Sequence, residues 1–266
     1  MSHTIELFEN LWQQYIQINP QAEQIHTLLE QRGEKVINDH IALRTFNTEK
    51  LGIINIATPF LDKGYQVVEE YDFAQKKLNA VHLEHQTDAN LPKVFISELK
   101  TELFSDELQE TVAKIDAQIP KINVMQDSFI TSGRTWNLTF EDYIQLLRES
   151  EYAAWTAAFG YRANHFTVSL NHLTTFFNLQ DLNAFLLKNG FTLNETGGLI
   201  KGTPEQFLEQ SSTMAAPVNV EFDHSTQVIP GCFYEFAKRY PKPNSGRLYQ
   251  GFIAASADKI FESTNN

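Results

Sequence analysis

Two stretches of the sequence each place a histidine within an alternating pattern of apolar and polar residues. The first is Asn38-Asp-His-Ile-Ala-Leu-Arg-Thr45, and the second is Arg162-Ala-Asn-His-Phe-Thr-Val-Ser-Leu170. Because side chains of a β-strand alternate between its two faces, His40 and Arg44 share one face of the first strand. The histidine can hold a metal while the arginine binds the far end of an anionic ligand. A half-buried strand with a structural histidine would show the same spacing, so the first stretch alone leaves both interpretations open.

A metal site needs more than the two histidines His40 and His165, and the best further ligand is a carboxylate from a later strand. The segment Gly231-Cys-Phe-Tyr-Glu-Phe-Ala-Lys-Arg-Tyr240 follows a Pro-Gly turn and predicts such a strand, with Glu235 between uncharged neighbours on its face. A carboxylate on that face needs a compensating partner, and a metal is a good one. Two histidines and one carboxylate favour non-haem Fe(II) and dioxygen chemistry, although Mn or Zn can occupy such a site.

Other candidates compete with this set. His82 and Glu84 share a strand face and could bind a metal or ligand, but a hydrogen bond between them is the more common outcome. Glu221 is a reserve third ligand, and Arg247 is either a second anion anchor or a surface arginine. Cys232 alternates to the face opposite Glu235, which favours a buried thiol. The sequence contains no Gly-rich phosphate loop and no Gly-x-Ser-x-Gly elbow.

The elements around the histidines repeat. Each predicted histidine strand is followed by a helix, a glycine turn and further strands, and the interval from histidine to glycine is 24 residues from His40 to Gly64 and 25 from His165 to Gly190. We therefore predict an α+β fold with two β-α-β-β-β modules that form a curved sheet around a metal pocket. The expected single domain comprises a helical cap (1–35), module one (36–100), a helical insertion (101–160) and module two (161–266). A capping-box-like start at Thr139 predicts one helix through Tyr152.

Composition limits the classes of function. The 266 residues are 42% hydrophobic and 20% charged, as in an ordinary globular protein, and the formal net charge of −12 argues against a nucleic-acid partner. The single cysteine excludes a disulfide framework and fits a reducing compartment. The N-terminus lacks the features of a signal peptide and no apolar run suggests a membrane span, so we predict a cytoplasmic protein with no membrane partner. Oligomeric state cannot be predicted.

Four segments together resemble the 2-oxoadipate dioxygenase/decarboxylase family, also called hydroxyglutarate synthase, in a short form. They are Asn38-Asp-His-Ile-Ala-Leu-Arg-Thr-Phe46, Ala163-Asn-His165, Pro230-Gly-Cys-Phe-Tyr-Glu-Phe-Ala237 and Ala257-Asp-Lys-Ile-Phe-Glu-Ser-Thr264. The resemblance covers about residues 35 to 264 and implies a fold similar to the vicinal-oxygen-chelate proteins.

The resemblance also implies a chemistry. It matches His40, His165 and Glu235 to Fe(II) ligands, for which Mn, Zn or Ni could substitute in purified protein, and Arg44 to the arginine that binds the substrate carboxylate. The implied reaction converts 2-oxoadipate and dioxygen to 2-hydroxyglutarate and carbon dioxide. Two alternatives stay open: a redox-neutral lyase, isomerase or hydrolase with a divalent metal as Lewis acid, and a non-catalytic protein that binds a small ligand.

Overall fold

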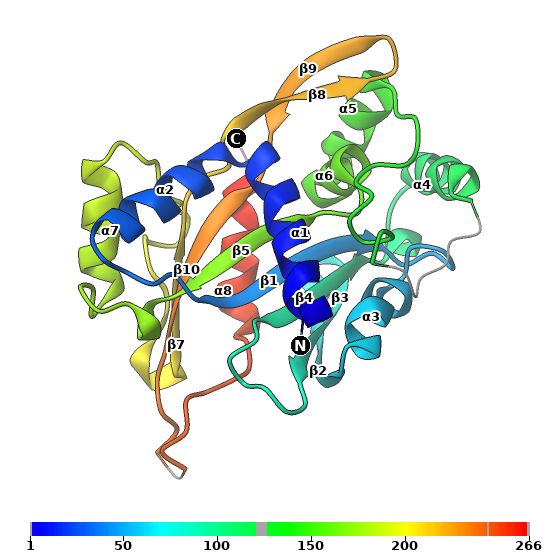
Figure 1. The fold of residues 1–266 in the computed structure, drawn as a ribbon. Coiled ribbons are helices and arrows are strands. Elements are labelled where there is room, and N and C mark those ends of the chain that lie inside the picture. The colour runs from blue at the N-terminus through cyan, green and yellow to red at the C-terminus, as the bar shows by residue number, and fades with distance from the viewer. Residues whose placement is uncertain (1, 121–126, 244, 265–266) are drawn as a thin grey trace. The chain divides into compact units, whose positions relative to one another are not determined.

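The computed structural model describes residues 2–120, 127–243 and 245–264 (Figure 1). Residues 121–126 of the expected helical insertion lie outside these ranges, as do residue 1 of the cap and residues 244, 265 and 266 of module two. The described chain forms two compact units. The first contains residues up to Tyr15, Ala42–Asn164 and Pro217–Ile229, and the second contains Ile16–Ile41, His165–Ala216 and the residues from Pro230 on. The predicted single domain stays a prediction.

Module one is built as a strand, a helix and three more strands. Its elements are β1 (Asn38–Phe46), α3 (Ile53–Asp62), β2 (Tyr65–Phe73), β3 (Leu78–His85) and β4 (Lys93–Leu99). Helix α3 ends where Gly64 takes a φ of +89°, a conformation that costs glycine little. The strands lie in the order β2-β3-β4-β1, and β3 pairs antiparallel with both β2 and β4.

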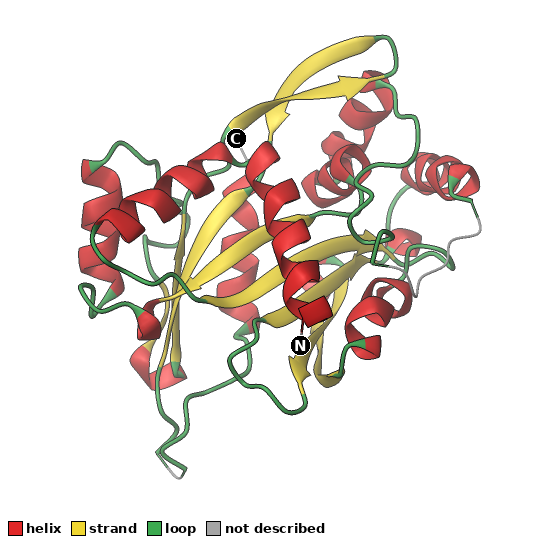
Figure 2. Ribbon diagram, viewed as in Figure 1, coloured by secondary structure: helices red, strands yellow, loops and turns green. Residues whose placement is uncertain are grey.

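Module two repeats this plan. Its elements are β5 (Ala163–Ser169), α7 (Leu179–Lys188), β6 (Lys201–Thr203), β7 (Leu208–Ser212) and β10 (Phe233–Arg239). Helix α7 ends at Gly190, whose φ is +87°. The strand order β6-β7-β10-β5 is the order of module one, with each strand in the matching place. In the sequence, β7 and β10 are separated by a two-stranded hairpin, β8 (Pro217–Phe222) and β9 (Ser225–Pro230), which forms a separate small sheet (Figure 2).

The turn before the third strand supplies independent evidence for duplication. In each module one turn of 3-10 helix, Ala74–Lys76 or Pro204–Gln206, leads to a residue in the left-handed region. These residues are Lys77, with φ of 55°, and Phe207, with φ of 66°. Side chains other than glycine rarely adopt this conformation, so its recurrence at matching places is informative. The predicted α+β class with two β-α-β-β-β modules is therefore confirmed.

The remaining helices include those predicted for the cap and the insertion, with one correction, and a C-terminal helix that was not predicted. They are α1 (Ser2–Ile18), α2 (Pro20–Gln31), α4 (Asp106–Gln118), α5 (Phe140–Glu149), α6 (Glu151–Phe159) and α8 (Ala254–Ile260), with further 3-10 turns at Thr101–Leu103, Leu170–His172 and Phe261–Thr264. The single helix predicted from Thr139 through Tyr152 is wrong. Ser150 adopts an extended conformation and its side chain accepts a hydrogen bond from the backbone N–H of Ala153, so it caps a second helix, α6.

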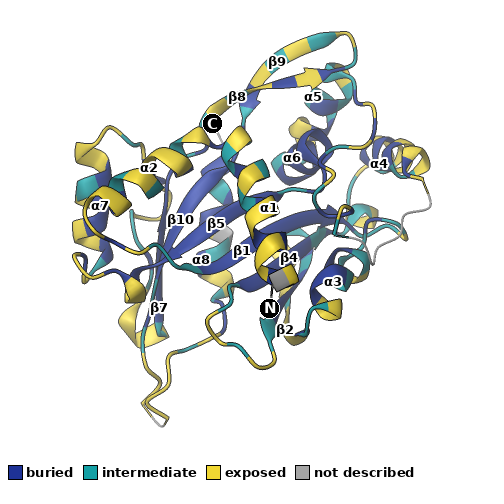
Figure 3. Cartoon of the chain, viewed as in Figure 1, coloured by how far each residue is buried: buried dark blue, intermediate teal, exposed yellow. Residues whose placement is uncertain are grey.

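In the second unit, the strands of module two are buried between helices. Helices α2 and α7 contact β10, whereas α8 contacts β6 and β7 from behind the strands in the view of Figure 1. Figure 3 shows β5 and most of β10 as buried: Ala163–Ser169 is buried at every residue, and β10 at every residue except Lys238. Polar side chains on these strands are therefore shielded from water and need partners within the protein. Among the described helices, none is long and apolar enough to cross a bilayer.

Candidate metal centre

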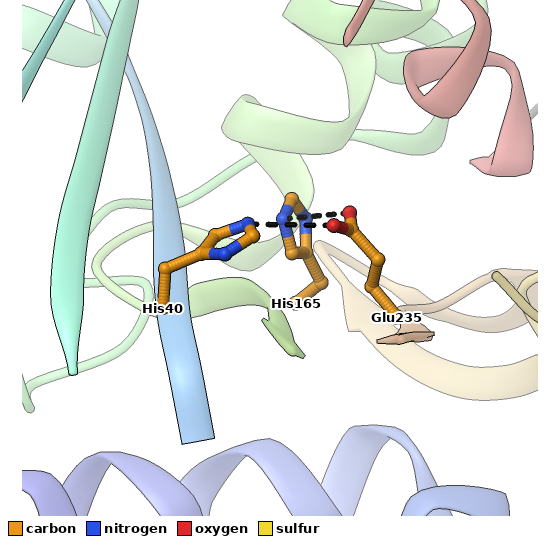
Figure 4. A group of neighbouring side chains, drawn as sticks. All are labelled: His40, His165 and Glu235. Carbon is orange, nitrogen blue, oxygen red and sulfur yellow. Dashed lines mark ion pairs between the residues drawn. The ribbon is translucent and has the colours of Figure 1, made fainter. Parts of the chain in front are cut away.

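His40, His165 and Glu235 come together in the second unit, on strands β1, β5 and β10 (Figure 4). Strand β10 runs parallel to β5, with Glu235 opposite Thr167 and Phe233 opposite His165. On its other side β5 lies next to the start of β1, where the N–H of Ser169 donates to the carbonyl of Ile37. The alternation inferred from the sequence therefore places all three side chains on one side of these strands.

The three ligand atoms lie close enough to share one ion. All fall within 4.8 Å of one another. His40 Nε2 is 3.5 Å from Glu235 Oε1, and His165 Nε2 is 3.4 Å from Glu235 Oε2. Two donors bound at about 2.1 Å to the same metal are separated by about 3.0 Å at right angles and about 3.4 Å at a tetrahedral angle. The two imidazole nitrogens and the carboxylate oxygens therefore need to move only slightly to coordinate one first-row metal ion.

The carboxylate of Glu235 is buried in an environment where a nearby cation would stabilise its charged form. Its side chain is fully buried, and burial raises its pKa above the ordinary value against the opposing effects of His40 and Gln210. Oε1 accepts a hydrogen bond of 2.7 Å from Gln210 Nε2. Among the described residues, Oε2 has no hydrogen-bond partner. A buried carboxylate oxygen in this state is costly unless a cation compensates it, so the residues present fit a divalent metal.

Aromatic rings hold both imidazoles in place. The ring of Phe233 stacks on that of His165 with centroids 4.6 Å apart, and Phe252 meets His40 edge-on at 4.8 Å. The two imidazoles themselves are nearly perpendicular, with centroids 5.6 Å apart. The hydroxyl of Thr167 lies 3.1 Å from His40 Nε2, the same nitrogen that faces Glu235. These contacts restrict the rotamers of the ligands before any ion binds.

Arg44, on the same strand as His40, is described within the first unit and has an acidic partner there. Its Nη1 lies 3.0 and 3.2 Å from the two carboxylate oxygens of Glu151, and its guanidinium sits over the rings of Tyr152 and Trp155. The Arg44 side chain is 1% exposed and that of Glu151 is 22% exposed. Ser150 caps α6 and so fixes Glu151 at the first helical residue, where the helix dipole favours a negative charge.

The other candidate residues are not brought into the group of three. His82 Nε2 lies 3.2 Å from Glu84 Oε1 and its Nδ1 lies 2.8 Å from the hydroxyl of Tyr71, all in the first unit. Glu221 is exposed on the β8–β9 hairpin and accepts a hydrogen bond from Thr226. Arg247 is exposed in the loop after β10. Cys232 is buried, as expected.

Three residues near the centre were missed by the sequence analysis. Asp39 contacts His40 Nδ1, Arg239 contacts Asp39, and Gln210 contacts Glu235. Asp39 stands next to the histidine in the first motif, so its position gave a signal. Arg239 and Gln210 gave none, because their roles depend on strand pairings that bring them next to residues far along the chain.

Comparison with known proteins gives a consistent result. The family model for 2-oxoadipate dioxygenase/decarboxylase matches residues 2–247. The rice protein named 2-oxoadipate dioxygenase/decarboxylase, chloroplastic/amyloplastic, is 36% identical over 284 residues, covering 98% of this chain and 78% of its own length.

Solved structures agree with the sequence match. A crystal structure of rice hydroxyglutarate synthase in complex with 2-oxoadipate is 35% identical, with a TM-score of 0.94 and coverage of 100% of this chain and 93% of its own. A Shewanella frigidimarina protein, provisionally named a hydrolase, is 52% identical, with a TM-score of 0.90 and coverage of 95% and 98%.

A more distant structure bears on the fold alone. A Ralstonia eutropha protein, provisionally assigned to the glyoxalase superfamily, has a TM-score of 0.74 at 21% identity and covers 92% of this chain and 84% of its own. The expected likeness to the vicinal-oxygen-chelate fold is thus confirmed. With the family model matching most of the sequence, the chain belongs to the 2-oxoadipate dioxygenase/decarboxylase family of enzymes.

Proposed function

We propose that this chain is an Fe(II)-dependent oxygenase that decarboxylates and hydroxylates 2-oxoadipate to give 2-hydroxyglutarate. The observation that carries the proposal is the buried group of two imidazoles and one carboxylate, in which Glu235 Oε2 lacks a hydrogen-bond partner among the described residues. This donor set favours Fe(II) with open coordination positions, and Mn, Zn or Ni would compete for it. The rice relative solved with 2-oxoadipate supports the choice of substrate.

The residues of the proposed metal site would have distinct roles. His40, His165 and Glu235 hold the metal, which when bound supplies a place where a 2-oxo acid and dioxygen can react. Phe233 and Phe252 keep the two imidazoles oriented and exclude water from them. Gln210 holds Glu235 Oε1 and so leaves Oε2 turned toward His165.

Arg44 would bind the distal carboxylate of the substrate. A buried guanidinium over two aromatic rings is suited to a carboxylate, because it is planar, permanently charged and weakly hydrated. Glu151 balances that charge before substrate arrives and keeps the guanidinium in one orientation. An incoming carboxylate would then share or replace this partner.

The proposed reaction balances without a further co-substrate. One molecule of 2-oxoadipate and one of dioxygen give one of 2-hydroxyglutarate and one of carbon dioxide. Loss of carbon dioxide leaves a five-carbon diacid whose new carboxylate takes one oxygen atom, and the second oxygen atom becomes the hydroxyl. The oxo acid supplies the electrons that reduce dioxygen.

The decisive experiment is dioxygen uptake by anaerobically Fe(II)-loaded protein with 2-oxoadipate, against a zinc-loaded control. We expect uptake that depends on substrate, matches carbon dioxide release one to one and is absent with zinc. With ¹⁸O₂, one label should enter the hydroxyl and one the new carboxylate. Turnover that proceeds equally under argon or with zinc would instead identify a redox-neutral lyase, isomerase or hydrolase.

A further inference from the structure

Asp39 lies between a proposed metal ligand and a buried arginine. Its Oδ1 is 2.8 Å from His40 Nδ1 and also accepts a 2.8 Å hydrogen bond from Arg239 Nη2, while its Oδ2 accepts a 2.7 Å bond from Arg239 Nε. Both side chains are almost entirely buried, at 5% exposed for Asp39 and 3% for Arg239. The paired contacts fix the plane of the carboxylate, so Asp39 cannot turn away from the imidazole.

This contact determines which nitrogen of His40 is available. An ionised carboxylate only accepts hydrogen bonds, so His40 Nδ1 must carry the proton and Nε2 keeps its lone pair. The guanidinium of Arg239 is permanently charged and donates one hydrogen bond to each oxygen of Asp39, which keeps Asp39 in the carboxylate form. Nε2 is the nitrogen that lies 3.5 Å from Glu235, so the tautomer selected by Asp39 is the one that a metal in the candidate site requires.

Arg239 also reaches the chain beyond β10. Its Nη1 donates to the carbonyls of Tyr249, at 3.0 Å, and Gly251, at 2.8 Å. The next residue, Phe252, packs its ring edge-on against His40 and lies under the Arg239 guanidinium at 5.2 Å. One guanidinium therefore binds both the carboxylate that orients His40 and the segment that carries the ring packed against it.

Stability alone is a weak reason for this arrangement. Burying an ion pair costs about as much in desolvation as its attraction returns, so the net gain over an apolar pair is small. Orientation of a ligand and attachment of the neighbouring segment are effects that an apolar pair would not supply.

We propose that Asp39 and Arg239 are positioning residues for His40, and that through Arg239 the docking of segment 249–252 and metal binding reinforce each other. The second half of the proposal rests on the metal role proposed above, whereas the tautomer of His40 can be measured without metal. The two effects are thermodynamically linked. If the docked segment 249–252 favours the orientation of His40 that binds metal, then bound metal must favour the docked segment to the same extent.

The first test compares Asp39→Asn with Asp181→Asn, a control that removes an exposed carboxylate from α7 in the same unit. Ring ¹⁵N shifts of the metal-free proteins should show a single Nδ1–H tautomer for His40 in the wild type and in the control, and a mixture in Asp39→Asn. Titration with Co²⁺ should give a dissociation constant about 10- to 100-fold higher for Asp39→Asn.

Several outcomes would overturn the role of Asp39. The proposal fails if His40 keeps a single Nδ1–H tautomer in Asp39→Asn, even if the affinity for Co²⁺ falls. It also fails if folded Asp39→Asn binds Co²⁺ as tightly as the wild type. If Asp39→Asn does not fold, the double variant Asp39→Asn with Arg239→Gln removes both buried charges together and must show the same mixed tautomer. A wild type that binds no Co²⁺ would count against the proposed function, while the tautomer would still decide the role of Asp39.

The second test addresses the coupling. Hydrogen exchange of peptides covering residues 249–260 should slow at least tenfold in wild-type protein when Co²⁺ is added. Arg239→Lys keeps the charge but cannot span Asp39 and two carbonyls, so the slowing should disappear. Arg32→Lys, which alters an arginine of the same unit packed on Phe176 and Phe185, should retain it. Equal slowing in Arg239→Lys and wild type would disprove the coupling.

Discussion

Phe95 holds in module one the position that Glu235 holds in module two. Strand β4 ends opposite the first residue of β3, and β10 ends opposite the first residue of β7. Counting back four residues from these matched ends reaches Phe95 in β4 and Glu235 in β10. In the proposed metal site each module would thus supply one histidine, and only the second would supply a carboxylate, giving three protein ligands.

Because a phenylalanine side chain offers no metal ligand, substitution of Phe95 should affect stability and leave metal binding intact. Its ring packs against those of Tyr71 and Phe73, with centroids 5.7 and 6.3 Å away, and is 5% exposed. We expect Phe95→Ala to lower the free energy of unfolding by about 3–5 kcal/mol. Urea denaturation and metal analysis check this, and loss of metal from folded Phe95→Ala would contradict it.

Removing one imidazole should empty the candidate centre. His165→Ala leaves one histidine and one carboxylate, too few donors for tight binding of a first-row metal. We expect metal content by mass spectrometry to fall to background and turnover to vanish. The control is His172→Ala, an exposed histidine that follows β5. Wild-type metal content in His165→Ala would remove this residue from the site.

Arg44→Ala should discriminate between substrates. If Arg44 binds the distal carboxylate, KM for 2-oxoadipate should rise about 10- to 100-fold through loss of a charged hydrogen bond worth about 1.5–3 kcal/mol. KM for 2-oxohexanoate, which lacks that carboxylate, should stay within about threefold. Arg148→Ala, at an exposed arginine of α5, should leave both constants unchanged. An equal rise of KM for both substrates would show that Arg44 acts by another route.

Lys201 should make the stability of the protein depend on alkaline pH. Burial lowers its pKa to about 8, against the attraction of Glu235 and Glu195, while a lysine in the unfolded chain has a pKa of about 10.4. Between these values the unfolded state binds more protons, so the contribution of Lys201 to folding becomes more favourable as pH rises. The free energy of unfolding of the wild type minus that of Lys201→Met should therefore become more positive from pH 8 to about pH 10. A difference independent of pH would show that Lys201 keeps an ordinary pKa.

The sequence predicted those parts of the fold whose cause is local. Alternation in Asn38–Phe46 marks a strand, and glycines at Gly64 and Gly190 mark helix ends because the left-handed conformation favours that residue. The break at Ser150 was missed, since a serine between charged residues that themselves suit a helix signals a cap only weakly.

Contacts between distant residues were beyond sequence reasoning. Glu151 meets Arg44 across 107 positions, and Arg239 meets Asp39 across 200. No periodicity encodes such pairs, because they depend on which strands become neighbours. His40, His165 and Glu235 were found together since each lies on a strand whose alternation and place in the repeat could be inferred separately.

The burial of the three proposed ligands has a consequence for how the enzyme acquires its metal. His40, His165 and Glu235 are 2%, 5% and 0% exposed. An ion held there can exchange only as often as the surrounding chain opens, and such openings are rare events in a packed core. The metal found after purification would then record which ions were present while the chain folded, not which ion binds most tightly at equilibrium. Supplying iron during expression should therefore matter more to the specific activity than supplying it to the finished protein.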